Sequence, residues 1–195
     1  MRKIASFIST IGHPLLTIPV FIVIVMFSTE AFATAALVSG LLICGVFIPV
    51  TLWAYLKSRN GSYTNFDVSD KKQRRSLFWF SVPLLTVATI VLFATNQSEN
   101  FCISVLFALI LLVVTQGVNF FVKSSLHVSF SIYLSSLIFM LNDKCCIAAL
   151  VFTGLISWSR IKLGRHTLTE VLFGLLIGGL ISLLMLRIEG YLELF

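Results

Sequence analysis

Charged side chains are scarce in this chain. Its 195 residues include 14 lysines and arginines and only 8 aspartates and glutamates, so 11% of the chain is charged. Soluble domains average about 25% charged residues. Hydrophobic residues make up 58% of the sequence. This balance excludes an ordinary soluble domain and predicts an integral membrane protein.

The residues that usually hold metals are also few. None of the four cysteines shows a Cys-x-x-Cys spacing, and the adjacent pair Cys145 and Cys146 is poorly placed to form a disulfide. We expect all four to be free thiols that pack as small apolar residues. The acidic residues form no carboxylate cluster that would bind a divalent ion. We therefore predict no metal and no other cofactor.

Apolar runs occupy most of the chain, and the longer ones reach the roughly 20 residues that a spanning helix needs. We predict an all-α, polytopic transmembrane helical bundle of six or seven membrane-spanning helices, with seven favoured by count. It would form a single domain over residues 1–195. The first run is interpreted as a retained membrane helix and not as a cleaved signal. The runs fall at 12–29, 34–56, 77–95, 101–122, 126–141, 145–159 and 167–187.

The basic residues gather on one side of the predicted membrane. With seven spans and the N-terminus inside, one face carries twelve of the 14 lysines and arginines, and the other carries Lys144 and Arg187. The positive-inside rule assigns the twelve to the cytoplasm. The net charge of +6 comes from connections between apolar runs. We therefore expect the bilayer and a lipid phosphate as partners, and no nucleic acid.

Three polar clusters lie on that same face, each just before an apolar run. They cover residues 70–75, 123–127 and 159–170. One predicted hairpin separates the first from the second, and another separates the second from the third. Because a hairpin returns the chain to the same side, all three clusters can meet at one site. Ionisable groups in a membrane are costly and usually functional.

The residues of these clusters predict phosphoryl chemistry. His166 and Glu170 are four residues apart and would share one face of a helix, so the carboxylate can orient the imidazole. His166 would be the nucleophile, and His127 would protonate the leaving group and then activate water. The remaining polar residues would neutralise the phosphate oxygens. These are Arg160, Ser125, Lys123, Lys71, Lys72, Arg74 and Arg75.

Each of these residues also has a simpler interpretation. Arg160 and the cations near it are compatible with interfacial anchors, and His127 with a polar contact between helices. Glu170 is compatible with an acid that complements a helix dipole. The 71–75 cluster is compatible with a solvated topology signal. His13, which precedes a proline, is interpreted as part of a helix start, and Gly174 and Gly178 as a small-residue face for close packing.

Three segments resemble signatures of the type-2 phosphatidic acid phosphatase superfamily. Ser159-Arg160-x5-His166-x3-Glu170 is similar to its Ser-Arg-x5-His-x3-Asp motif, with Glu in place of Asp. Ser125-Leu126-His127 is similar to the end of Pro-Ser-Gly-His, and 71–75 stands where Lys-x6-Arg-Pro is expected. The resemblance covers about residues 67–180, and the His13-Pro14 segment is similar to a bacterial membrane branch.

The resemblance implies a metal-independent phosphatase that uses a phosphohistidine intermediate. His166 would be its nucleophile, His127 its acid and Arg160 a phosphate ligand. Its substrate would be a phosphatidyl-alcohol phosphate such as phosphatidylglycerol phosphate, or phosphatidic acid. The implied location is the bacterial inner membrane, and the positive-inside count favours a cytoplasmic site.

Other functions remain open at this point. One is a polyprenyl pyrophosphate phosphatase, and another is a non-catalytic lipid-binding protein on the same scaffold. A phosphotransferase or prenyltransferase is a further alternative. Membrane prenyltransferases need two aspartate-rich motifs for magnesium, whereas this chain offers only the stretch from Asp67 to Asp70.

Overall fold

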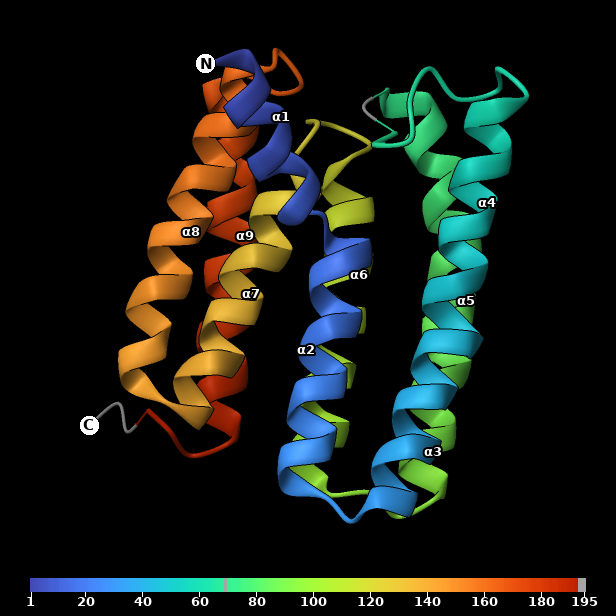
Figure 1. The fold of residues 1–195 in the computed structure, drawn as a ribbon, viewed down its shortest axis with the longest axis vertical. Helices are drawn as coiled ribbons and strands as arrows, with labels where there is room; N and C mark the ends of the chain where they lie inside the picture. The colour runs from blue at the N-terminus through green and yellow to red at the C-terminus, as the bar shows by residue number, and fades with distance from the viewer. Residues whose placement is uncertain (69, 193–195) are drawn as a thin grey trace. The chain divides into compact units, whose positions relative to one another are not determined.

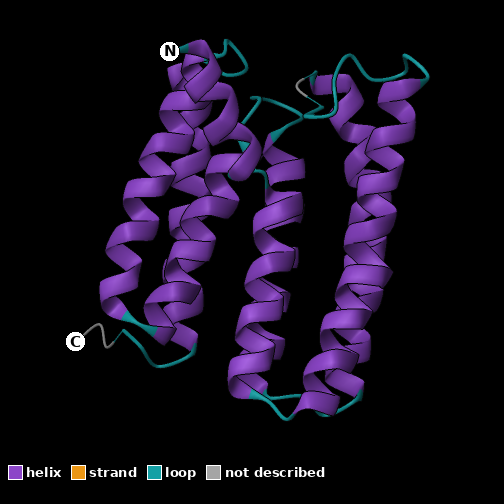
Figure 2. Cartoon of the chain, viewed as in Figure 1, coloured by secondary structure: helices purple, strands orange, loops and turns teal. Residues whose placement is uncertain are grey.

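The computed structural model describes residues 1–68 and 70–192, and this part of the chain contains helices but no strand (Figure 2). The predicted all-α class is therefore confirmed. The chain forms two compact units. The first unit joins Met1–Pro14 to the chain from Ser98 onward, and the second is Leu15–Gln97.

The first unit contains the helices α1, α6, α7, α8 and α9. Helix α7 packs against both α8 and α9, α1 packs on α8, and α6 packs on α9 and α7 (Figure 1). The sequence did not predict α1, because this short segment mixes polar and apolar residues and contains no long apolar run. The bounds are Arg2–Ile11 for α1, Glu99–Val118 for α6, Leu126–Leu141 for α7, Asp143–Lys162 for α8 and Leu168–Ile188 for α9.

Two glycines set the close approach of α9 to α7. A Cβ at Gly174 would lie 2.8 Å from the carbonyl oxygen of Ser125, and one at Gly178 would lie 2.6 Å from that of Ser129. The Ser129 hydroxyl uses this proximity to donate to the carbonyl oxygen of Gly174 at 3.0 Å. The predicted small-residue face is therefore confirmed. It brings the N-terminal ends of α7 and α9 into contact.

The second unit contains α2 (Pro14–Thr29), α3 (Phe32–Leu42), α4 (Ile48–Arg59) and α5 (Lys71–Ala94). A π-helical turn, η1 (Ile43–Phe47), joins α3 to α4 without a break. Helix α5 packs on α3, η1 and α4. Asp70 caps α5 by accepting from the backbone amides of Lys72 and Gln73 at 2.9 and 3.0 Å.

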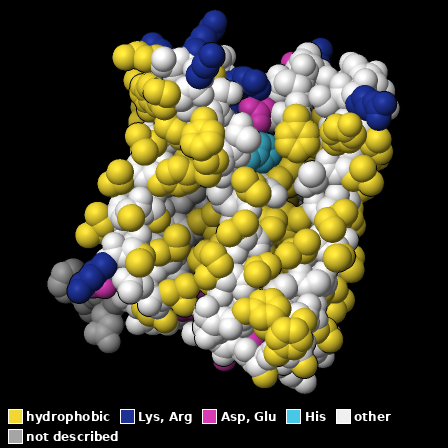
Figure 3. Space-filling view, viewed as in Figure 1, with side chains coloured by type: hydrophobic (Ala, Val, Ile, Leu, Met, Phe, Trp, Pro, Cys, Tyr) yellow, Lys and Arg dark blue, Asp and Glu magenta, His cyan; other side chains and the backbone are white. Residues whose placement is uncertain are grey.

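Five helices of the described chain are long and apolar enough to cross a membrane, and a sixth results if α1 and α2 make one broken span. Helix α7 is apolar but has 16 residues, about 24 Å at 1.5 Å per residue, which is shorter than the roughly 30 Å hydrocarbon core. Seven spans remain a prediction. Exposed apolar side chains cover much of the visible helix surface, as Figure 3 shows. The five helices are Phe32–Arg59, Lys71–Ala94, Glu99–Val118, Asp143–Lys162 and Leu168–Ile188.

Candidate active site at the ends of α7, α8 and α9

The loop between α8 and α9 folds back on the last turn of α8. Gly164 has a φ of +68°, in the left-handed region that glycine adopts without strain. The chain then turns so that the backbone amides of Arg165 and His166 both donate to the carbonyl oxygen of Arg160, at 3.1 and 3.3 Å. This loop therefore places His166 next to the helix end that carries Arg160.

His166 and Glu170 form the predicted contact. The Nδ1 atom of His166 lies 2.8 Å from Oε2 of Glu170, and the histidine is buried. The prediction that the two residues share one face of a helix was wrong, because α9 begins only at Leu168, with Thr167 as its N-cap, and His166 lies before it. Thr167 and Glu170 form a capping box, so the same carboxylate caps the N-terminus of α9 and orients the imidazole of His166. A carboxylate that accepts from Nδ1–H leaves the lone pair of a neutral imidazole on Nε2.

Lys123 forms an ion pair with Glu170. Its Nζ atom is 3.2 Å from Oε2 of Glu170, the same oxygen that contacts His166, and it donates to the carbonyl oxygen of Arg165 at 2.9 Å. The sequence suggested only a phosphate ligand at this position. The structure adds a second task, because Lys123 ties the connection before α7 to the loop before α9.

Arg160 is completely buried in the last turn of α8. Its Nη1 atom donates to the hydroxyl oxygen of Ser9 at 2.8 Å, and Ser9 lies on α1. Sequence reasoning missed Ser9. The available signal was the amphipathic spacing of residues 2–11, a segment that contains no long apolar run.

The second polar cluster begins α7 and meets the start of α9. The backbone amide of Ser125 donates to the carbonyl oxygen of Glu170 at 3.1 Å. Ser125 and His127 are both buried, and the Ser125 hydroxyl has no hydrogen-bond partner among the described residues. The structure thus brings His127, Ser125, Lys123 and the Arg160–Glu170 segment together in one unit.

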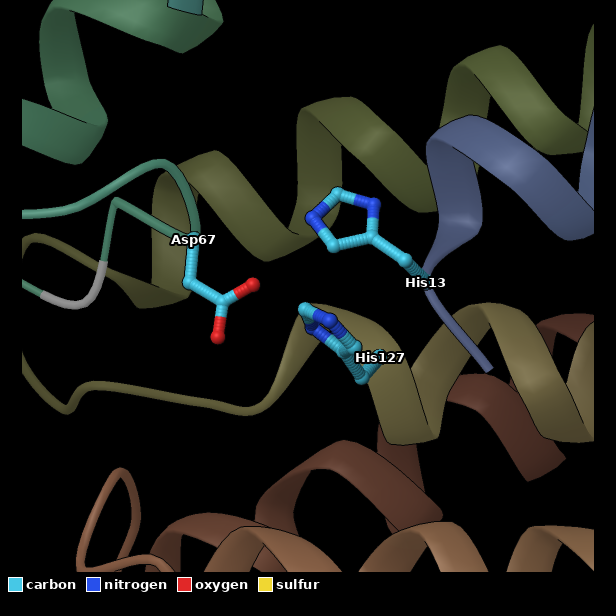
Figure 4. A group of neighbouring side chains, drawn as sticks. All are labelled: His13, Asp67 and His127. Atoms are coloured by element: carbon cyan, nitrogen blue, oxygen red, sulfur yellow. The ribbon is translucent and has the colours of Figure 1, made fainter. Parts of the chain in front are cut away.

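His13 joins this group without having been predicted to do so. Its ring lies edge-on to that of His127, with centroids 4.6 Å apart and an interplanar angle of 79° (Figure 4). The sequence interpretation treated His13 only as part of a helix start, and Pro14 does begin α2. Nothing in the local pattern signalled the contact, because the two histidines are far apart in the chain.

The first polar cluster belongs to the second unit. Lys71, Lys72, Arg74 and Arg75 form the first turns of α5. Arg74 is buried, and its Nε atom donates to the carbonyl oxygen of Val68 at 3.4 Å. Their approach to a bound phosphate remains a prediction from the sequence.

No protein-family model, curated protein or solved structure matches this chain. The family resemblance therefore rests on the signature residues alone.

Proposed function

We propose that this protein is a metal-independent membrane phosphatase related to the type-2 phosphatidic acid phosphatases, and that it hydrolyses a lipid phosphate monoester. The contact between His166 Nδ1 and Glu170 carries the proposal. A buried imidazole that is oriented by a carboxylate, beside a buried guanidinium, is the equipment of a phosphohistidine enzyme. If Glu170 served only to complement the dipole of α9, its contact with the histidine would not be needed.

In the first step, Nε2 of His166 attacks phosphorus as the bond from phosphorus to the lipid oxygen breaks. His127 donates a proton to that oxygen, so the lipid alcohol leaves neutral. Glu170 stabilises the positive charge that develops on His166. Arg160 offers planar donors to the equatorial phosphate oxygens, and the buried Ser125 hydroxyl at the start of α7 is a further donor.

In the second step, water attacks the phosphohistidine. His127, now neutral, accepts a proton from the water, the bond from nitrogen to phosphorus breaks, and the electron pair returns to Nε2 of His166. Inorganic phosphate leaves and the starting protonation states are restored. Lys123 balances the charge of Glu170 at 3.2 Å while His166 alternates between its neutral and phosphorylated forms.

The substrate is a phosphatidyl-alcohol phosphate or phosphatidic acid, which can enter from the bilayer between apolar helices. The cytoplasmic face of a bacterial inner membrane suits such a biosynthetic intermediate, and the distribution of basic residues favours it. A polyprenyl pyrophosphate phosphatase would use the same steps, with His166 attacking the terminal phosphorus, the bond to the bridging oxygen breaking and polyprenyl monophosphate leaving. The relative rates on the two substrate classes decide between these alternatives.

The first experiment measures phosphate release in detergent micelles with a chelator present. His166→Ala should abolish release and Arg160→Ala should lower it by roughly 100- to 1,000-fold, because each removes a group that acts on the phosphoryl transition state. Lys162→Ala is the matched control, since this exposed cation lies in the same last turn of α8 and should leave the rate unchanged. A His166→Ala protein that matches the wild type on every lipid phosphate, with an unchanged thermal transition, would refute the nucleophile assignment.

A second experiment tests the acid role of His127 by changing the leaving group. His127→Ala should lower hydrolysis of an alkyl lipid phosphate by about 100-fold or more, since proton donation contributes roughly that much. An aryl phosphate has a phenolate leaving group, which departs without being protonated. With this substrate, the His127→Ala protein should form the phosphohistidine at nearly the wild-type rate. Equal losses on both substrates in single-turnover measurements would contradict the assignment.

A further inference from the structure

Helix α1 has three distinct faces. Ala5 and Ser9 are buried against the bundle, and α1 packs on α8. Ile4, Phe7 and Ile11 recur at helical spacing and are 58%, 66% and 41% exposed. The remaining sector holds the polar residues Arg2, Lys3, Ser6 and Thr10. A helix that combines an exposed apolar face with a basic, polar one is typical of membrane interfaces.

The contacts of α1 fix its level along α8. Ser9 accepts from Arg160, which is two residues before the end of α8, or about 3 Å at 1.5 Å per residue. A Cβ at Gly12 would lie 2.5 Å from the side chain of Ile156, six residues or about 9 Å from the same end. If the candidate span α8 crosses the membrane, these contacts place the C-terminal part of α1 within about 9 Å of one end of that span, where headgroups meet acyl chains.

We propose that α1 is an interfacial helix that binds the lipid surface through Ile4, Phe7 and Ile11 and, from that position, holds Arg160 through Ser9. Arg2 and Lys3 in its first turn complement anionic headgroups. Helix α1 packs on α8, which is a candidate span, so one bilayer can cover the exposed apolar residues of both helices. The role of Ser9 rests on the phosphate-binding role proposed for Arg160, whereas the membrane contact of α1 does not.

The membrane contact is tested without measuring activity. In a protein whose Trp53, Trp79 and Trp158 are replaced by phenylalanine, a single tryptophan is introduced by Phe7→Trp or, as the matched control on the polar face, by Thr10→Trp. Both proteins are placed in phosphatidylcholine–phosphatidylglycerol vesicles whose acyl chains are brominated near the headgroups. Quenching of the Phe7→Trp protein should be at least about twofold stronger, because its face lies in the acyl boundary.

Equal quenching of the two proteins, or stronger quenching with Thr10→Trp, would overturn the lipid contact. Protection of the Phe7→Trp tryptophan from brominated lipid, together with cross-linking between two chains through α1, would assign this face to a second copy and would also overturn it.

The link to Arg160 is tested by Ser9→Ala, with Ser9→Thr as the conservative variant and the exposed Ser6→Ala as the control one turn earlier. Loss of a hydrogen bond to a charged group should raise KM for the lipid phosphate by roughly 10- to 100-fold. Ser9→Thr should restore KM, and Ser6→Ala should have no effect. An unchanged KM in an active Ser9→Ala protein would overturn the coupling. If the wild type itself releases no phosphate, the proposed function and this coupling both fail, while the quenching result still decides the position of α1.

Discussion

At the scale of single residues, one carboxylate oxygen organises the candidate site. Oε2 of Glu170 lies 2.8 Å from Nδ1 of His166, 3.2 Å from Nζ of Lys123 and 3.3 Å from the backbone nitrogen of Thr167. Because three donors converge on one atom, the position of this oxygen sets the orientation of the imidazole. Through Lys123, the Glu170 carboxylate also joins the connection before α7 to the start of α9.

Glu170→Gln should lower kcat for phosphate release by roughly 100- to 10,000-fold, because an amide neither fixes the tautomer of His166 nor stabilises its positive charge. Glu170→Asp should keep part of the activity, since the charge remains although the side chain is one methylene shorter. The measurement is kcat at saturating lipid phosphate.

The matched control is Glu99→Gln. Glu99 lies in the first turn of α6 as Glu170 lies in the first turn of α9, so both substitutions remove an acid near a positive helix end. If the two variants had the same kcat, Glu170 would be a helix-dipole residue and the proposed mechanism would lose its orienting group.

At the scale of helices, the site depends on how closely α7 and α9 approach. The carbonyl oxygen of Ser125 faces Gly174, and the backbone of Ser129 faces Gly178. Since both neighbours are backbone atoms, they cannot move aside as a flexible side chain does. The glycines therefore keep His127 near the segment that carries His166 and Glu170.

Gly178→Ala should destabilise the protein by about 1–3 kcal/mol, the usual cost of inserting a methyl group into a filled interface. Gly179→Ala is the control, because nothing lies within 4 Å of its added Cβ. That change should be neutral or stabilising, by up to about 1 kcal/mol, through better helix propensity. The free energy of unfolding in mixed micelles measures both. Equal effects of the two substitutions would mean that α7 and α9 do not pack this closely.

At the scale of the whole molecule, the apolar helices and the distribution of basic residues together predict an orientation in the membrane. Residue 144 lies in the first turn of α8, and residue 165 lies just after its end. If α8 is a span, these two positions lie on opposite sides. The predicted cytoplasmic site puts residue 165 inside.

Lys144→Cys and Arg165→Cys, each in a protein whose four native cysteines are replaced by serine, test this orientation. In intact cells, a membrane-impermeant maleimide should label Lys144→Cys and should not label Arg165→Cys. After permeabilisation both should react. The reverse pattern would put the site on the outer face, and labelling of both or neither in intact cells would show that α8 does not cross the membrane as predicted.

The sequence by itself determined the helical class, the presence of apolar helices long enough to cross a membrane, and the contact of His166 with Glu170. These follow from composition and from residues only four apart, which local backbone geometry brings within reach. The local prediction still erred in detail, because the capping preference of Thr167 starts α9 after His166. Leu126 stands where the signature that this segment resembles has glycine, and its φ is not positive, so leucine adds no backbone strain there.

Only the tertiary structure decided which distant residues meet at the site. Ser9 and Arg160 are 151 residues apart, and Lys123 and Arg165 are 42 apart. His13 meets His127 in the same way. Such contacts depend on which helix faces pack together, and here two glycines and the position of α1 on α8 settle that. Hydrophobic periodicity shows that a face is buried but does not name the helix that covers it, so these partners could not be predicted from the sequence.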